Sequence, residues 1–288
     1  MIRNGSAHKS QSNGTLWIHI FLIAFTGLTL FPILGVLRAA FDAQGGMSTS
    51  LGLFPEVPTL EHFETLLTER SASGELVFMS HLTNSIVVSL ATTIAGIFLA
   101  CTAAYAFSRF EFTGRKTGLM GFLVSQMFPG VLTLAPLYVL LNSMGLINEL
   151  AGLIVVYSTT SIPFCVWMLK GYFDTIPKDL EESALIDGAS QFTIFWRIIL
   201  PLAAPAVAVT ALFSFMTAWN EFILASVFMT EASAYTLPVK INSYVNNEEI
   251  RWGLFAASSL LVSLPVMGLF YSLQKYLVGG LTAGAVKG

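Results

Sequence analysis

Residues 150–169 read LAGLIVVYSTTSIPFCVWML, twenty residues without a charge between Glu149 and Lys170. The apolar core of a bilayer is roughly 30 Å thick and needs about 20 helical residues to cross it. An unpaired backbone group in hydrocarbon costs several kcal/mol, so a segment that enters the bilayer must be helical. This stretch of about 20 uncharged residues therefore predicts a transmembrane helix.

Five more runs of this kind, free of Asp, Glu, Lys and Arg, lie at residues 16–37, 82–108, 117–148, 198–220 and 252–274. Pro129 and Pro136 predict bends in the run at 117–148. The first run is longer than the apolar part of a signal peptide, roughly 7–15 residues, so we expect it to be retained. The sequence thus predicts an all-α membrane protein with six transmembrane helices.

The composition agrees with a membrane protein and excludes several other classes. Of the 288 residues, 55% are hydrophobic and 11% charged, whereas an average soluble domain has about a quarter charged residues. A soluble enzyme is excluded on this ground, and a formal net charge of −3 argues against nucleic acid as a partner. Cys101 and Cys165 lie in apolar stretches and the four histidines are scattered, so we expect neither a disulfide framework nor a metal site.

The basic residues predict the orientation of the spans. With both termini in the cytoplasm, ten of the 14 lysines and arginines lie inside, and Arg38, Arg70, Lys240 and Arg251 lie outside. Cytoplasmic loops carry the excess of basic residues, so this N-in, C-in topology is favoured. The expected organisation is a cytoplasmic N-terminal segment (1–15), a first transmembrane helix (16–38), an external loop or cap (39–81), a five-helix core (82–277) with a cytoplasmic loop at 170–200, and a cytoplasmic tail (278–288).

The 170–200 loop is long for a connection in a helix bundle. Pro177 fits a helix start, and the acidic residues that follow it oppose the helix dipole. Leu180, Ala184 and Leu185 fall on one face of this helix, and Gly188 suits a left-handed C-terminal stop. These features support equally a two-helix element that projects into the cytoplasm and an amphipathic hairpin that lies in the membrane interface.

The spacing of the loop decides between these two interpretations. Glu182-Ser183-Ala184, three residues, Gly188, nine residues, Ile198, one residue and Leu200-Pro201 resemble the EAA motif of ABC importer permeases, with Ser183 in place of the usual first alanine. The resemblance implies the ABC type I importer permease fold and a coupling helix that docks in a groove on an ATP-hydrolysing subunit. The implied coupling residues are Glu182, Ser183, Ala184, Asp187 and Gly188.

Individual roles follow from the same resemblance. Glu182 would pair with a basic residue of the ATPase, while Ala184 and Gly188 would allow close packing. The alternative for Glu182 is that it only opposes the helix dipole. For Asp187, a local cap of the turn is favoured over a direct contact with the partner.

Three further stretches narrow the resemblance: QMFP at 126–129, KGYF at 170–173 and the tail LVGGLTAGAVKG at 277–288. Over nearly its whole length the chain resembles the smaller permease subunit of maltose/maltodextrin importers. The tail would then insert between two ATPase subunits through Leu281, Thr282, Ala283, Gly284 and Gly288. The loop at 241–250 would reach into an external sugar-binding protein through Tyr244, Val245, Asn246 and Asn247. A disordered terminus and a merely solvated loop are the alternatives.

Glu221, next to Asn220, is the one acid inside an apparent helix, and such residues often mark a transport pathway. Twenty residues from Pro201, at about 1.5 Å each, place it roughly 30 Å along a straight helix, near the outer interface. Anchoring at that interface together with Trp219 is therefore favoured over pathway lining by Asn220 and Glu221.

The resemblance implies a permease subunit in the cytoplasmic (inner) membrane, which carries maltose or maltodextrin, or else trehalose or another α-glucoside. The chain has no Gly-x-x-x-x-Gly-Lys-Ser/Thr motif, so we expect it to be non-catalytic and to bind no cofactor. ATP and Mg would be held by two copies of a separate ATPase. The further implied partners are a larger permease paralogue, an external sugar-binding protein and membrane lipid; a homodimeric pore is also conceivable.

Two other classes fit the sequence less well. An ATP-independent secondary transporter usually shows internal repeats and ionisable residues near the bilayer midplane, and neither is evident. A membrane-embedded enzyme would need a His, Ser/Lys or paired-carboxylate constellation within a span, and the six runs contain no Asp, Glu, Lys or Arg and one histidine, His19.

Overall fold

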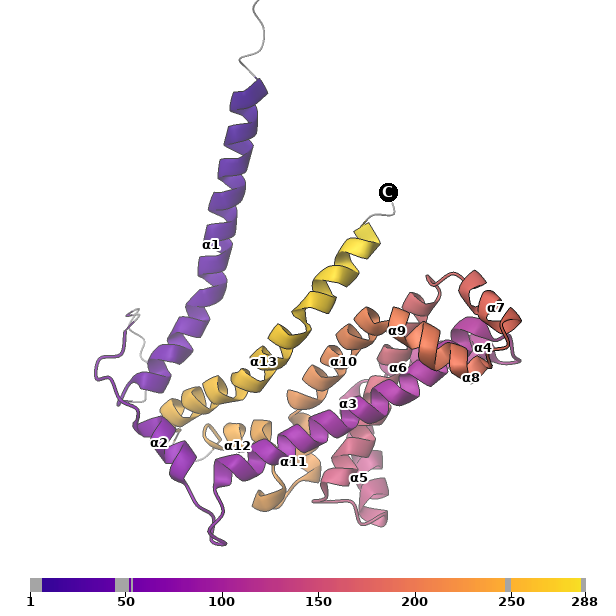
Figure 1. Ribbon diagram of the computed structural model, residues 1–288. Helices are drawn as coiled ribbons and strands as arrows, with labels where there is room; N and C mark the ends of the chain where they lie inside the picture. Colours follow the sequence, from indigo (N-terminus) through magenta and orange to yellow (C-terminus); the bar gives the residue numbers. More distant parts are fainter. Residues whose placement is uncertain (1–6, 45–51, 53, 247–249, 286–288) are drawn as a thin grey trace, which may run out of the picture. The chain divides into compact units, whose positions relative to one another are not determined.

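The computed structural model describes residues 7–44, 52, 54–246 and 250–285, and the elements found there are helices (Figure 1). The chain divides into two compact units. The first comprises Met1–Glu69 and Ile241–Leu261, and the second comprises Arg70–Lys240 and Val262–Gly288. Each is described by itself.

The first unit contains α1 (Ala7–Phe41), α2 (Glu61–Thr68) and the beginning of α13 (Trp252–Ala285). Polar contacts join Glu56 to the end of α1. The Arg38 guanidinium pairs with the Glu56 carboxylate at 3.0 Å, and the Asp42 carboxylate accepts the Glu56 N–H at 3.0 Å. The side chains of α1 between residues 15 and 36 are exposed, although most are apolar. A long apolar helix with exposed side chains belongs in lipid or against another protein.

The second unit is built around three helices, α3 (Val77–Arg109), α6 (Leu150–Phe173) and α10 (Ala204–Trp219), which pack on one another. Small residues recur at helical spacing among the buried positions of α3: Ser85, Ser89, Thr92, Gly96, Ala100 and Ala104. A Cβ atom added at Gly96 would lie 3.2 Å from the Ser161 hydroxyl of α6. Small residues let helix backbones approach closely where lipid offers no hydrophobic drive for association.

The remaining helices of this unit connect or extend the three central ones. They are α4 (Arg115–Met127), η1 (Gly130–Thr133), α5 (Leu134–Ser143), α7 (Asp179–Ile186), α8 (Gln191–Ile194), the π-helical η2 (Phe195–Ile199), α9 (Leu200–Leu202), α11 (Ile223–Phe228) and η3 (Ala232–Ala234). Helix α12 (Leu237–Ser243) runs from the second unit into the first.

Four helical stretches are long and apolar enough to cross a membrane, at Thr15–Phe41, Val77–Arg109, Leu150–Phe173 and Trp252–Tyr276. Two bent pairs bring the number to as many as six, if each pair is one span. These are Arg115–Met127 with Gly130–Ser143, bent by 95°, and Gln191–Leu202 with Ala204–Trp219, bent by 77°. All six predicted runs therefore correspond to apolar helices or bent pairs.

The bends correct the predicted spans in two places. Pro129 lies at the 95° bend as predicted, but Pro136 lies in the first turn of α5, where the helix continues. Proline is tolerated there because the first N–H groups of a helix have no intrahelical acceptor. The run at 198–220, expected as one helix, is broken after Leu202.

Gly152 gives a test of the contact between α6 and the turn that precedes it. A Cβ atom at this position would overlap the carbonyl oxygen of Leu146 in that turn, whereas a Cβ at Gly171 on the same helix would meet nothing within 4 Å. We expect Gly152→Ala to destabilise the protein by about 1–3 kcal/mol, the typical cost of overpacking. Gly171→Ala is the matched control and should be neutral or slightly stabilising. Thermal unfolding in detergent measures both, and equal midpoints would contradict the close approach.

Candidate functional site

The short helix α7 in the 170–200 loop forms as the sequence predicts. It begins at Asp179, two residues after Pro177, and ends at Ile186. Gly188 has a φ of +86°, and the Ala189 N–H donates to the Ala184 carbonyl at 2.9 Å. This pattern closes a helix with a left-handed residue, so the predicted stop at Gly188 is confirmed.

Glu181 is the buried residue of α7 and was not among the predicted site residues. Nε of Arg109, the last residue of α3, donates to its carboxylate, and the side chains are 6% and 10% exposed. The Tyr105 hydroxyl also donates to Glu181, at 3.0 Å, and Arg109 donates to the Ile176 carbonyl at 2.9 Å. These bonds attach α7 to the end of α3.

Asp174, just after α6, forms a second attachment at the base of the loop. The Ser108 hydroxyl donates to its carboxylate at 2.6 Å, and Lys170 pairs with it at 2.6 Å. Partial burial favours the neutral acid, but the hydrogen bonds from Lys170 and Ser108 outweigh this and lower the pKa of Asp174 below its ordinary value. The carboxylate is therefore ionised at neutral pH and holds the end of α6 to α3.

The outward side of α7 carries the predicted coupling residues. Glu182, Ser183 and Asp187 are exposed and Ala184 is half-buried. We expected Leu180, Ala184 and Leu185 to form an apolar face, but Leu180 and Leu185 are 45% and 44% exposed and Glu181 faces inward instead. The Arg109 guanidinium pairs with the inward carboxylate of Glu181, a long-range contact that the periodicity of the helix does not report.

The exposed surface of the loop is a mixture of acidic and apolar side chains. Ile186 is 88% exposed and Phe192, at the start of α8, is 72% exposed. Within the described residues the Asp187 carboxylate makes no hydrogen bond, so the expected local cap of the turn is not observed. Exposed apolar side chains beside unpaired carboxylates form a surface suited to a protein partner with basic residues.

The residues predicted to contact the external sugar-binding protein differ in how far their side chains are exposed. Tyr244 is 5% exposed, and its burial, together with the neighbouring Glu69, raises its pKa. Val245 is half-buried and Asn246 is exposed. Asn247 lies outside the described residues.

The predicted tail residues belong to a longer helix than expected. Helix α13 continues past Gln274 to Ala285, so the backbone at Leu281, Thr282, Ala283 and Gly284 is helical. Gly288 lies outside the described residues. Helix α13 therefore extends over the glycines at 279, 280 and 284.

Glu221 lies in the break between α10 and α11. Its carboxylate accepts the N–H groups of Leu224 and Ala225 at 2.8 and 3.0 Å, and the Tyr157 hydroxyl at 2.6 Å. Trp219 is 2% exposed, so its ring packs inside the protein. The anchoring of Glu221 at the membrane interface stays a prediction. The depth estimate assumed a straight helix from Pro201, whereas the chain bends by 77° after Leu202.

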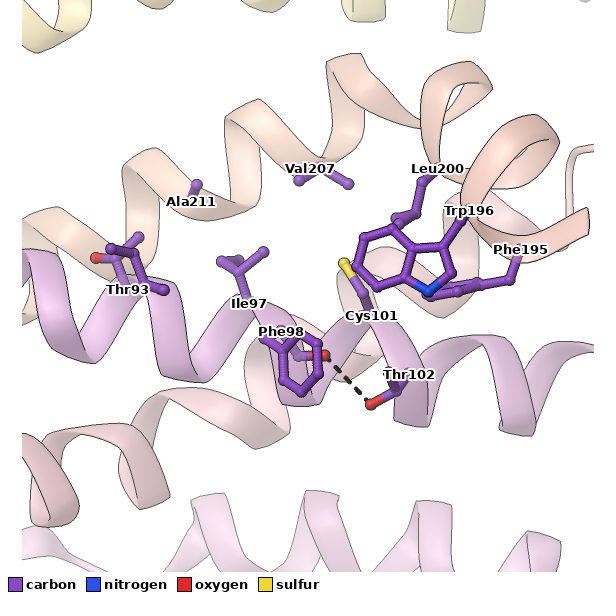
Figure 2. Close-up of a pocket in the computed structure, with 11 residues that line it drawn as sticks. Thr93, Ile97, Phe98, Cys101, Thr102, Phe195, Trp196, Leu200, Val207 and Ala211 are labelled. Carbon is purple, nitrogen blue, oxygen red and sulfur yellow. Dashed lines mark hydrogen bonds between the residues drawn. The ribbon is translucent and has the colours of Figure 1, made fainter. Parts of the chain in front are cut away.

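An apolar groove of about 380 Å³ lies between α3 and the segment from η2 to α10 (Figure 2). Thr93, Phe98 and Cys101 of α3 face Trp196 of η2 and Ala211 of α10 across it. The lining is almost entirely apolar. A sugar needs several polar partners for its hydroxyl groups, so this groove is not a sugar-binding site.

Sequence comparisons identify the family. The profile described as "binding-protein-dependent transport system inner membrane component" matches residues 75–282. The chain belongs to this family. It is a non-catalytic permease subunit of an ABC transporter in the inner membrane, and ATP hydrolysis is carried out by separate ATPase subunits.

Relatives cover almost the whole chain. The maltose/maltodextrin transport system permease protein MalG of Yersinia pestis is 37% identical, over 97% of this chain and 96% of that protein. The galactooligosaccharides transport system permease protein GanQ of Bacillus subtilis is 39% identical, over 95% of each. A chain of a bacterial ABC transporter that imports the polysaccharide alginate has the same fold, with a TM-score of 0.76, 19% identity, and coverage of 96% of this chain and 99% of that one.

The attachment of α7 can be tested at Arg109. Arg109→Met leaves the Glu181 carboxylate buried without its cation, which typically costs about 3–5 kcal/mol. We expect the double variant Arg109→Met/Glu181→Met to recover most of this stability, because the uncompensated charge is gone. Lys116→Met, at an exposed position, is the control and should change stability by less than about 0.5 kcal/mol. Unfolding midpoints in detergent give the comparison; a double variant less stable than Arg109→Met would refute the pairing.

Proposed function

We propose that this chain is one half of the translocation pathway of an ATP-driven, binding-protein-dependent sugar importer. Identity of 37–39% to the MalG and GanQ permeases over nearly the whole chain is the observation that supports this most strongly. Both relatives are named for oligosaccharides. Maltose or maltodextrin is the proposed substrate because of the QMFP, KGYF and tail stretches, with trehalose or another α-glucoside as the alternative.

The coupling site is the outward side of α7. Glu182 contacts a basic residue of the ATPase, and Ala184 and Gly188 allow the two surfaces to approach. The contacts of Glu181 and Asp174 with α3 support this role, because they join the exposed surface to the ends of two spanning helices. Closure of two ATPase subunits then moves these helices as rigid bodies and alternates access to the pathway.

The proposed assembly contains a larger permease paralogue, two ATPase copies and an external sugar-binding protein. The exposed apolar side chains of α1 are available for contacts with a second permease and with lipid. The topology is N-in, C-in, with 1–15 and 278–288 in the cytoplasm, 16–38 as first span, 39–81 as external cap, and 82–277 as core carrying the coupling loop at 170–200.

The two remaining contact regions belong to the same assembly. The end of α13, at residues 281–284, and Gly288 contact the ATPase pair. The external loop contacts the sugar-binding protein through the exposed Asn246 and its neighbours Val245 and Asn247. Tyr244 supports the loop from inside, since its side chain is buried.

Copurification tests the assembly directly. The tagged chain, extracted in mild detergent from its native membrane, should be recovered with one larger permease and an ATPase in a ratio of one to one to two. Mass spectrometry identifies and counts the subunits. Recovery of the chain alone, in a form that transports sugar after reconstitution, would overturn the proposal in favour of a secondary transporter.

Glu182→Lys tests the coupling role. Reversing the charge places two cations together at the contact, so we expect sugar uptake to be lost while insertion of the subunit is unchanged. Asp179→Lys is the matched control, because Asp179 is an exposed acid in the first turn of the same helix. If Glu182 only opposed the helix dipole, both variants would lose the same small amount of helix stability, about 0.3–1 kcal/mol, and would transport alike. Uptake assays and immunoblots of the membranes distinguish these outcomes.

A further inference from the structure

The break between α10 and α11 is held by a carboxylate whose hydrogen-bonding partners among the described residues are all neutral. Glu221 stands between Trp219, where α10 ends, and Ile223, where α11 begins. Its two oxygens accept two backbone N–H groups of α11 and the hydroxyl of Tyr157 on α6. An ionised carboxylate is an acceptor only, so three donors and no acceptor match its charged form.

The position of this contact along α6 makes it unusual. Tyr157 is 3% exposed and lies seven residues from Leu150, the start of the helix, or about 10 Å at the helical rise of 1.5 Å per residue. The carboxylate of Glu221 is therefore held beside the body of a spanning helix and not at its end. Acids placed within membrane spans are costly, and their positions mark function.

A second set of bonds holds the far end of α11 to the beginning of α6. Asn148 has a φ of +63°, and its side-chain oxygen accepts the N–H groups of Thr230 and Glu231 at 2.6 and 3.0 Å. Its own N–H donates to the Phe228 carbonyl at 3.0 Å. Helix α11 is thus fixed at both ends, by Glu221 to α6 and by Asn148 to the turn before α6.

We propose that Glu221 is a positioning residue of the transport cycle, which through Tyr157 makes α11 and the segment after it move together with α6. This inference rests on the proposed function. The other end of α6 leads into the coupling loop through Asp174, so α6 joins the segment that enters the external loop at Glu231 to the surface that contacts the ATPase. A movement that starts where the sugar-binding protein docks is then transmitted through α6 to the ATPase, provided that α11 cannot move independently.

The test uses the complete transporter, reconstituted in liposomes with its ATPase and sugar-binding protein. Three variants are compared: Tyr157→Phe, Glu221→Gln and the two combined. We expect Tyr157→Phe to leave basal ATPase activity unchanged and to reduce stimulation by the binding protein about three- to tenfold, the effect of losing one typical hydrogen bond. The double variant should lose less than the sum of the two single losses, because both changes weaken the contact that Tyr157 and Glu221 share.

Two controls distinguish a positioning role of Glu221 from a general loss of folding or activity. Tyr271→Phe makes the same change at an exposed tyrosine and should retain full stimulation. Hydrogen exchange should show faster exchange of the Leu224 and Ala225 amides in Glu221→Gln than in the unchanged protein. Full stimulation in both single variants, or additive losses in the double one, would overturn the inference while leaving the proposed function intact. Absence of any stimulation in the unchanged, assembled transporter would overturn both.

Discussion

The 170–200 loop depends on the buried ion pair between Arg109 and Glu181. Two charges taken out of water lose their hydration, which only close contact and further hydrogen bonds can replace. Here Tyr105 donates to the acid, and the base donates to the Ile176 carbonyl. With Glu181 held inward, the adjoining Glu182 faces outward, and Leu180 and Leu185 are exposed as well. The surface proposed for the ATPase is therefore a consequence of an acid that does not itself belong to that surface.

Much of the fold could be predicted, because span length and the absence of charge follow directly from bilayer thickness. The bend at Pro129 was also visible in the sequence. The 77° bend after Leu202 was not, since the prolines there lie in first turns, where helices tolerate them. The straight helix on which the depth of Glu221 was calculated is therefore not present.

Only part of the candidate site could be predicted, because some of its contacts join distant parts of the sequence. Local signals placed α7 and its stop at Gly188 correctly, because caps and dipoles act within a few residues. The pairing of Arg109 with Glu181 joins positions 72 residues apart, and no periodicity within one segment reports such a contact. Helical periodicity alone therefore placed the leucines inside. Burial of Tyr244 against Glu69 was hidden in the same way, because the two come from separate parts of the chain.

The two acids that anchor the second unit are stabilised in different ways, and their surroundings explain the difference. Glu181 meets Arg109 at the last residue of a spanning helix, where a long basic side chain keeps its charge away from lipid. Glu221 lies beside the body of α6, where a second buried charge would add its own desolvation cost. Two N–H groups at a helix start and one phenol stabilise its carboxylate without a cation. Helix α6 takes part through Tyr157 in its body and through Asp174 directly after its last residue, so its rigidity connects two contacts that differ in chemistry.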